Sequence, residues 1–204
     1  MNIEDILNEY KFETLNSKHL LSDFCCDSND LNDFLKNDAL NQQHDKMNLT
    51  KLVVYNGDII GYFSLLTDTL RLKYIRNDLT KKQLHSHLPK SKLLPAIKIG
   101  RFAIDNEYSG NGIGTHVLNN VLYDLNYYSK MKLGFRFIVV DGYAKAYNFY
   151  KRNNFVNLKK DDELVKNLNW IVKRDPKRQF YLYYDLMNLR FWLYFNLITS
   201  VVNW

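Results

Sequence analysis

The chain is poor in cysteine, proline and glycine. Its 204 residues include two cysteines, three prolines and eight glycines. Cys25 and Cys26 are neighbours in the sequence, where a disulfide is strained and uncommon, and the sequence has neither a Cys-x-x-Cys motif nor zinc-ligand spacing. A disulfide-stapled secreted domain and a zinc module are therefore excluded, and we predict reduced cysteines in a cytoplasmic protein.

The sequence also lacks the usual signals for export and for membrane insertion. The segment Met1–Asp5 has neither the basic start nor the apolar stretch of a signal peptide. The stretch from Leu186 to Trp204 is apolar and aromatic, with Arg190 as its only charge, but it is too short and too polar for a membrane span. We expect no membrane partner. The stretch is either a terminal helix packed on the core or an interface, with a second copy in a homodimer or with another protein.

Length and composition predict a single domain covering residues 1–204. With 46% hydrophobic and 15% aromatic residues, the chain can bury a substantial core without disulfides or metal. Helical spacing over Asn29 to His44 precedes a hairpin from Lys51 to Thr67, whose Asn56-Gly57 turn lies between apolar runs. A helix over Asp161 to Leu168 and a strand over Gln179 to Tyr184 follow later, so the fold class is α/β.

Three of the eight glycines lie within five residues, at 110, 112 and 114. They follow the strand-like segment Ile97–Ile104 and precede a helix predicted from Thr115 to Ser129. A glycine loop between a strand and a helix N-terminus is suited to hold phosphate, because its backbone turns sharply and the first helical N–H groups attract negative charge. A Walker loop would need Lys and Ser or Thr after its last glycine, and a dinucleotide fingerprint would need a different glycine spacing.

With its flanking segments, the glycine loop resembles the acetyl-CoA core of the GNAT superfamily of N-acetyltransferases. The resemblance rests on Arg101–Asp105, the loop, the strand Phe135–Asp141 and the segment Ala146–Phe155, within residues 96–158. Upstream, Phe24-Cys25-Cys26 and Leu31–Ala39 are similar to the opening of the toxin-like acetyltransferases, one branch of that superfamily. The resemblance implies a mixed sheet that opens between the strand ending at Ile104 and the strand beginning at Phe135, with acetyl-CoA in the opening and no metal.

The resemblance also implies roles for particular residues. Tyr150 matches the tyrosine that gives a proton to the leaving thiolate; a phenol has that proton to give because its pKa, near 10, lies above that of a thiol. Tyr143 and Tyr147 are assigned to packing. Backbone groups of the strand end would contact the pantetheine arm and the developing oxyanion. The cofactor-binding residues implied in this way are Phe102, Ala103, Ile104, Ser109, Gly110, Asn111, Gly112, Ile113, Gly114 and Thr115.

Some positions depart from the family pattern or stay open. Ser109 replaces an Arg or Gln, which removes a side-chain contact to the cofactor, and Asn154 replaces a Gly in a position where asparagine tolerates left-handed backbone angles. Asp105 and Glu107 are alternative general bases beside the loop, or else solvated charges. His116 is assigned to solvent or loop contact. The pair His85 and His87 lacks a third ligand for a metal.

The acceptor is the least determined part of the reaction. The net charge is +6, and basic residues gather between Arg71 and Lys98 and again between Lys173 and Arg178. Such a surface can follow RNA phosphates, bind the anionic cofactor or merely be solvated. The first hypothesis is an N-acetyltransferase for a small molecule or protein amine. The alternatives are a toxin-like enzyme that acetylates aminoacyl-tRNA and is neutralised by an antitoxin, and a non-catalytic acyl-CoA-binding module.

Overall fold

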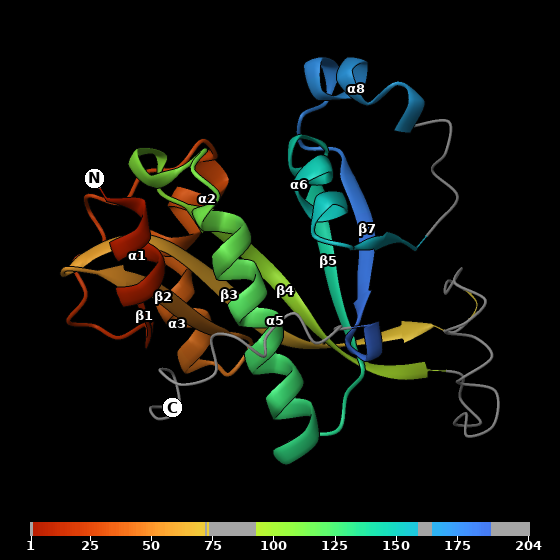
Figure 1. Cartoon of the computed structure of the whole chain (residues 1–204), viewed down its shortest axis with the longest axis horizontal. Helices are drawn as coiled ribbons and strands as arrows, with labels where there is room; N and C mark the ends of the chain where they lie inside the picture. The colour runs from red at the N-terminus through yellow and green to blue at the C-terminus, as the bar shows by residue number, and fades with distance from the viewer. Residues whose placement is uncertain (1, 72, 74–92, 159–164, 189–204) are drawn as a thin grey trace.

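The structure is a computed structural model, and it describes residues 2–71, 73, 93–158 and 165–188 (Figure 1). Its regular elements are α1 (Ile3–Glu9), β1 (Lys11–Thr14), α2 (Asn29–Asp33), a π-helical turn (Phe34–Asp38), α3 (Ala39–His44), β2 (Leu49–Tyr55), β3 (Asp58–Arg71), β4 (Leu93–Ile104), α5 (Ile113–Met131), β5 (Phe137–Tyr143), α6 (Tyr147–Arg152), β6 (Val156–Asn157), α8 (Leu168–Arg174) and β7 (Gln179–Asp185). Short 3₁₀ turns follow β4, β5 and β7.

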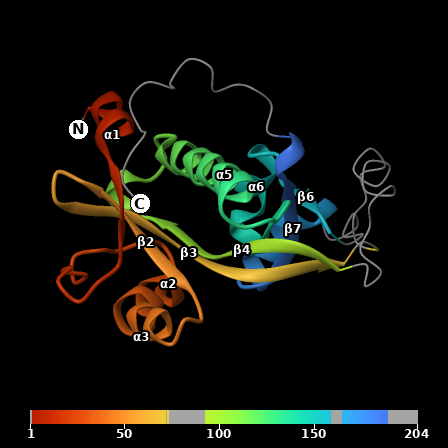
Figure 2. The same ribbon diagram turned by 90° about the horizontal axis from the view of Figure 1, so that it is seen from below.

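The strands described form a mixed sheet of seven, in the order β1-β2-β3-β4-β5-β7-β6. Its neighbours are antiparallel except for β4 and β5, which run parallel. Helices α1 and α5 lie on one face and α2 and α3 on the other, as Figure 2 shows. We call the side of the sheet that carries α5 the near face, and the opposite side the far face. This arrangement confirms the predicted α/β class with a mixed central sheet flanked by helices.

The sheet opens between β4 and β5. Their parallel pairing runs only from Ala96 opposite Phe137 to Ile99 opposite Val140, although β4 continues to Ile104 and β5 to Tyr143. On the other side of β4, the register against β3 shifts between Ser64 and Leu65, so that Gly100 is the extra residue of a β-bulge. A bulge bends its strand and increases the local twist. The pairing therefore ends where the bulge begins, and the strands diverge from that point (Figure 1). We call this opening the fork.

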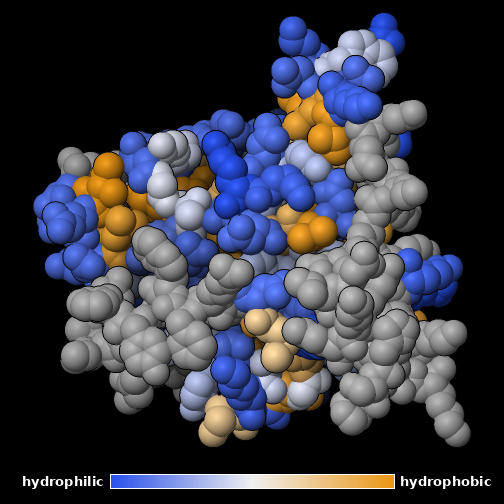
Figure 3. Space-filling view, turned by 45° about the vertical axis from the view of Figure 1, so that its right-hand side comes forward, coloured by the Kyte–Doolittle hydropathy of each residue, from blue (hydrophilic) through white to orange (hydrophobic). Residues whose placement is uncertain are grey.

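The two faces of the sheet carry separate apolar cores. The near face holds the larger cluster, which includes Val117 and Leu118 of α5 together with Ile99 and Val140 from the two strands of the fork. The far face holds one cluster around Phe34, Leu35 and Tyr62 beneath α2 and α3, and another around Phe137 and Tyr183. On the face seen in Figure 3, hydrophilic side chains cover most of the described surface, and hydrophobic ones form small separate patches.

Several elements form where the sequence predicts them, and others begin at different residues or lie partly outside the described residues. The hairpin, the helical region 29–44 and the strand at 179–184 form where they were predicted. The strand expected from Phe135 begins at Phe137. Of the helix expected over 161–168, residues 161–164 lie outside the described residues, residues 165 and 166 are helical, and α8 begins at Leu168. The basic segment 74–92, with His85 and His87, and the C-terminal stretch from 189 lie outside the described residues.

Candidate active site

The glycine loop follows the end of β4 and leads into α5. Gly110 and Gly112 both have φ of +82°, a left-handed conformation that side chains with a Cβ rarely adopt, and an added Cβ at either would meet nothing within 4 Å. Their role is thus conformational. Gly112 is the N-cap of α5, and residues 109–112 are exposed. The N-terminal N–H groups of a 19-residue helix therefore begin at an accessible loop, as an anion site requires.

The predicted cofactor residues and the predicted tyrosine come together on the near face of the fork. The Phe102 ring stacks on Phe149 of α6 with centroids 5.6 Å apart, and Phe149 meets the Tyr150 ring edge-on at 5.2 Å. A Cβ at Gly114 would lie 3.4 Å from Ile104 and 3.5 Å from Phe149. Residues distant in the sequence thus form one wall that joins β4, α5 and α6.

Tyr150 lies against β5 just beyond the last paired residue. A Cβ at Gly142 would lie 3.1 Å from two carbons of the Tyr150 ring, so only glycine lets the ring approach so closely. The side chain is buried, and burial raises the pKa of its phenol well above the ordinary value. The hydroxyl is therefore protonated at neutral pH. By contrast, Tyr147 donates a hydrogen bond to Asn157 Oδ1 at 3.0 Å inside the core, which is a packing role.

Asp105 ties the loop to the N-terminal region. Its Oδ2 accepts a hydrogen bond from the Cys25 backbone N–H at 2.7 Å, and its Oδ1 accepts one from the Glu107 N–H at 2.9 Å. The Asn106 N–H in turn donates to the Cys25 carbonyl at 2.8 Å. Because both carboxylate oxygens already hold backbone N–H groups, the geometry favours an anchoring role for Asp105 over that of general base. Glu107 is exposed.

The other singled-out positions have clear local surroundings. Asn154 has φ of +65°, the left-handed conformation predicted for it, and it ends the turn after α6. Ser109 is exposed, and its hydroxyl donates to the Asn106 carbonyl at 3.1 Å. His116 points away from the loop: its Nδ1 lies 3.1 Å from the Tyr10 hydroxyl, and burial lowers its pKa. The described residues contain no group of three or more potential metal-ligating side chains.

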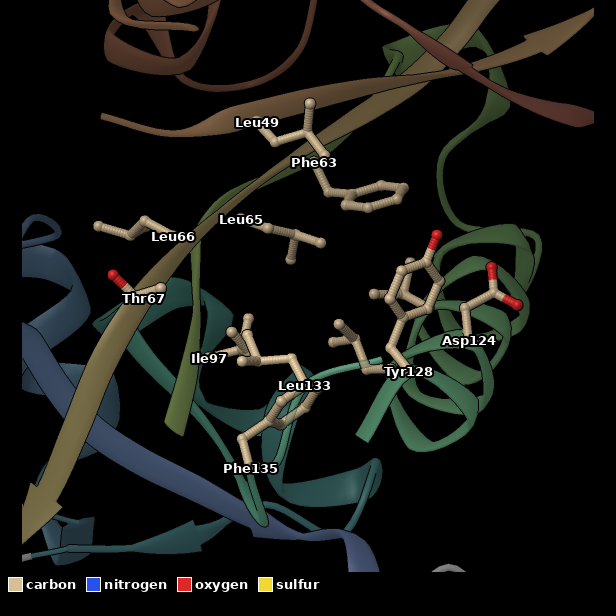
Figure 4. A pocket seen from close by; sticks show the side chains of 12 residues that line it. Leu49, Phe63, Leu65, Leu66, Thr67, Ile97, Asp124, Tyr128, Leu133 and Phe135 are labelled. Atoms are coloured by element: carbon tan, nitrogen blue, oxygen red, sulfur yellow. The ribbon is translucent and has the colours of Figure 1, made fainter. Parts of the chain in front are cut away.

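One apolar cavity lies away from the glycine loop. It has a volume of about 210 Å³ and lies between β3, β4 and the C-terminal half of α5. Leu65, Ile97 and Phe135 are among the side chains that converge on it in Figure 4. Its lining on α5 begins at Val121, in the middle of the helix, whereas the glycine loop precedes the helix, and we do not assign the reaction to it.

Sequence reasoning missed the charged groups of the fork. Lys98 of β4 forms an ion pair with Asp141 of β5 just where the pairing ends, and Asp30 of α2 contacts Tyr143 of β5. Asp141 is the single charge of the apolar strand β5, and Lys98 is a cation within the apolar run at the centre of β4; this is the signal that could have revealed their pairing. No local pattern relates Asp30 to Tyr143, which lie 113 residues apart in the sequence.

A sheet opened by a bulge beside a glycine loop and a helix N-terminus defines the GNAT fold class. The solved structures that resemble the chain agree with this class. AtaT complexed with acetyl-methionyl-tRNAfMet has a TM-score of 0.69 at 20% identity, over 88% of this chain and 96% of AtaT. A tyrosine-to-phenylalanine variant of KacT also has a TM-score of 0.69 at 20% identity, over 87% and 95% of the two chains.

AtaT has further been solved, as a tyrosine-to-phenylalanine variant called a toxin, with the C-terminus of the antitoxin AtaR and acetyl-CoA. That structure has a TM-score of 0.63 at 20% identity, over 88% of this chain and 94% of AtaT. No family model and no curated relative matches the sequence. At these identities the likeness establishes the fold. None of the helices in the described ranges is long and apolar enough to cross a membrane.

Proposed function

We propose that the chain is a toxin-like N-acetyltransferase that moves the acetyl group of acetyl-CoA to the amine of an aminoacyl-tRNA and is neutralised by an antitoxin protein. The observation that carries the transferase activity is the fork itself, with the glycine loop at its mouth and Tyr150 against its wall. The choice of acceptor is supported by the structural likeness to AtaT, solved with an acetylated aminoacyl-tRNA and with an antitoxin. The small-molecule or protein acceptor of our first hypothesis has no comparable support.

The residues of the fork fit acetyl-CoA. The N–H groups at the start of α5 and the left-handed glycines at 110 and 112 suit its pyrophosphate. The edge of β4 from Gly100 to Ile104 no longer pairs with β5 and can pair with an amide-containing arm, as an added strand does. When bound, acetyl-CoA supplies an acetyl thioester, whose carbonyl the acceptor amine attacks.

The chain's own groups then have distinct tasks. Backbone N–H groups around Phe102 and Ala103 hold the charge that develops on the carbonyl oxygen. The Tyr150 hydroxyl gives its proton to the departing sulfur, because burial keeps the phenol protonated. The Phe102–Phe149 stack covers the near face and excludes water from this wall. In the solved variants of AtaT and KacT, too, the replaced residue is a tyrosine.

The test is to incubate the purified protein with acetyl-labelled acetyl-CoA and cell extract, and then to follow the label. We expect label in the RNA fraction, released by mild base as an aminoacyl ester is. Label in protein or small molecules would replace the proposed acceptor but keep the transferase. Binding of acetyl-CoA without transfer to any fraction would instead indicate an acyl-CoA-binding module.

A further inference from the structure

The far face of the fork is charged, whereas its near face is apolar. Side chains alternate along a strand, and the bulge at Gly100 reverses the order. Ile99 and Phe102 thus both point to the near-face core, which leaves Lys98 and Arg101 on the far face. On β5 the same alternation places Asp141 and Tyr143 there, since Val139 belongs to a far-face cluster.

One carboxylate spans the opening on this face. Asp30 projects from α2 on the β4 side, and its Oδ2 accepts a hydrogen bond at 3.3 Å from the hydroxyl of Tyr143 on β5. Its Oδ1 accepts another at 3.0 Å from the ammonium of Lys177. Nearby, Lys145 donates to the Asp27 carbonyl at 2.9 Å. We call the contacts of Asp30 with Tyr143 and Lys177 the Asp30 bridge. It rejoins the two halves of the sheet above the point where they separate.

The ion pair between Asp30 and Lys177 in the Asp30 bridge can be replaced by competing ions. The hydrogen bond from Lys177 and its charge hold the pKa of Asp30 below the usual range, with Tyr143 and Arg101 adding to the effect, so this carboxylate is ionised at neutral pH. The Lys177 and Asp30 side chains are nonetheless 69% and 40% exposed. An ion pair so open to solvent is weak and screened by salt, and a competing ion can replace either partner.

The route by which the acceptor can reach the thioester also favours the far face as the acceptor side. On the near face, α5 and the Phe102–Phe149 stack cover the fork, and the proposed function places acetyl-CoA there. An acceptor must then reach the thioester from the opposite side, past Asp30. The amine end of an aminoacyl ester of RNA carries an ammonium close to phosphates, so it presents both charges that a Lys–Asp pair can bind.

We propose that Asp30 binds the acceptor's amino group as an ammonium in place of Lys177, that this group loses its proton to solvent before the free amine attacks the thioester, and that the released Lys177 binds a phosphate of the same acceptor. This inference rests on the proposed function and names the groups that select its substrate. The carboxylate already holds a primary ammonium at hydrogen-bond distance, and Lys177 is the resident counterpart of the substrate group.

The test is steady-state acetylation of total aminoacyl-tRNA, charged with a mixture of amino acids, by the full chain. For Asp30→Asn we expect KM for the charged tRNA to rise about tenfold, with kcat within about twofold and the affinity for acetyl-CoA unchanged, since only acceptor binding is lost. Asp30→Glu should recover most of the lost affinity. The matched control is Asp33→Asn on the same helix, where the carboxylate is exposed and accepts from Asn37 instead; its KM should not change.

A charge-swapped double variant separates binding from a structural role. Asp30→Lys with Lys177→Asp restores an ion pair across the fork but places a cation where the ammonium must bind. Because the new lysine also faces Arg101, we expect a thermal stability between that of Asp30→Lys alone and that of the wild type, with a raised KM. A wild-type KM in this double variant, or in Asp30→Asn, overturns the inference, as does a loss of acetyl-CoA binding in Asp30→Asn. If the wild-type chain itself acetylates no charged tRNA, the proposed function fails, and the inference fails with it.

Discussion

Tyr150 is at once a core residue and the proposed acid. Replacing it by Phe keeps the packing against Phe149, Phe155 and Gly142 and removes only the hydroxyl. We expect Tyr150→Phe to fold and to bind acetyl-CoA as the wild type does, while turnover falls about 100-fold or more, the usual contribution of a positioned acid. Single-turnover acetylation and calorimetric binding of acetyl-CoA measure the two effects.

The neighbouring Tyr147 provides the matched control for that experiment. Tyr147→Phe removes a hydroxyl that donates to the buried Asn157 Oδ1, so it should cost about 1 kcal/mol of stability and leave turnover close to wild type. Equal losses of turnover in the two variants would place the catalytic effect in the packing of α6 and remove Tyr150 from the mechanism.

The folding stability is expected to depend on pH through the carboxylate of Asp124. Burial raises its pKa to about 6, and the charge of Lys51 partly opposes this rise. An unfolded aspartate has a pKa of about 3.9, so folding favours the protonated form. The contribution of Asp124 to stability is then most favourable below about pH 4 and is lost as pH rises towards 6.

Asp124→Asn should remove this loss. Above pH 6 we expect the variant to be more stable than the wild type by about 1–2 kcal/mol, a figure reduced for the partial exposure of the carboxylate. At pH 4 the two should differ little. Urea denaturation at pH 4, 6 and 8 measures the difference, and a variant that is less stable at pH 8 would show that the carboxylate is stabilised in the fold.

At the scale of elements, two glycines at the start of α5 differ in what a side chain would disturb. At Gly112 it would disturb the backbone conformation, and at Gly114 only the neighbouring side chains. Gly112 has φ of +82° at the N-cap of α5, so Gly112→Ala should cost about 1–2 kcal/mol and weaken acetyl-CoA binding by turning the first N–H groups. Gly114 lies within the helix with 3.4 Å to its nearest neighbour, so Gly114→Ala should be neutral or slightly stabilising. Thermal unfolding of both variants tests this order, and a reversed order would contradict it.

The same loop shows what can be predicted from the sequence. Glycine spacing after a strand and before a helix is a local pattern, and it correctly located the loop and α5. Asn154 was likewise foreseen as left-handed, because asparagine is among the few side chains that adopt that conformation.

Other features depend on contacts between distant segments. The end of the β4–β5 pairing is set by the register of β4 against β3 at Ser64, and no local pattern encodes that register. The Asp30 bridge joins α2 to the end of β5 and to the segment before β7, so its members become neighbours only in the folded sheet.

At the scale of the whole molecule, the charge distribution bears on how RNA would bind. The chain carries a net charge of +6, and in Figure 1 α8 lies at the end towards which β4 and β5 diverge. The last turn of α8 exposes Lys173 and Arg174. Lys130 and Lys132 are exposed at the C-terminal end of α5, away from α8. An RNA whose acceptor end enters the fork would pass the first pair and not the second.

Salt dependence tests this placement. Raising salt from about 50 to 200 mM should weaken tRNA binding by the wild type about 10- to 100-fold, as expected for a few neutralised phosphates. Replacing Lys173 and Arg174 together by Gln should make the logarithmic salt slope shallower by about 1 to 2, because each lost phosphate contact removes just under one unit. The double replacement of Lys130 and Lys132 by Gln removes the same charge and should leave the slope unchanged. Equal slopes in the two variants would mean that RNA senses only the net charge of the protein, and α8 would then have no part in guiding the acceptor to the fork.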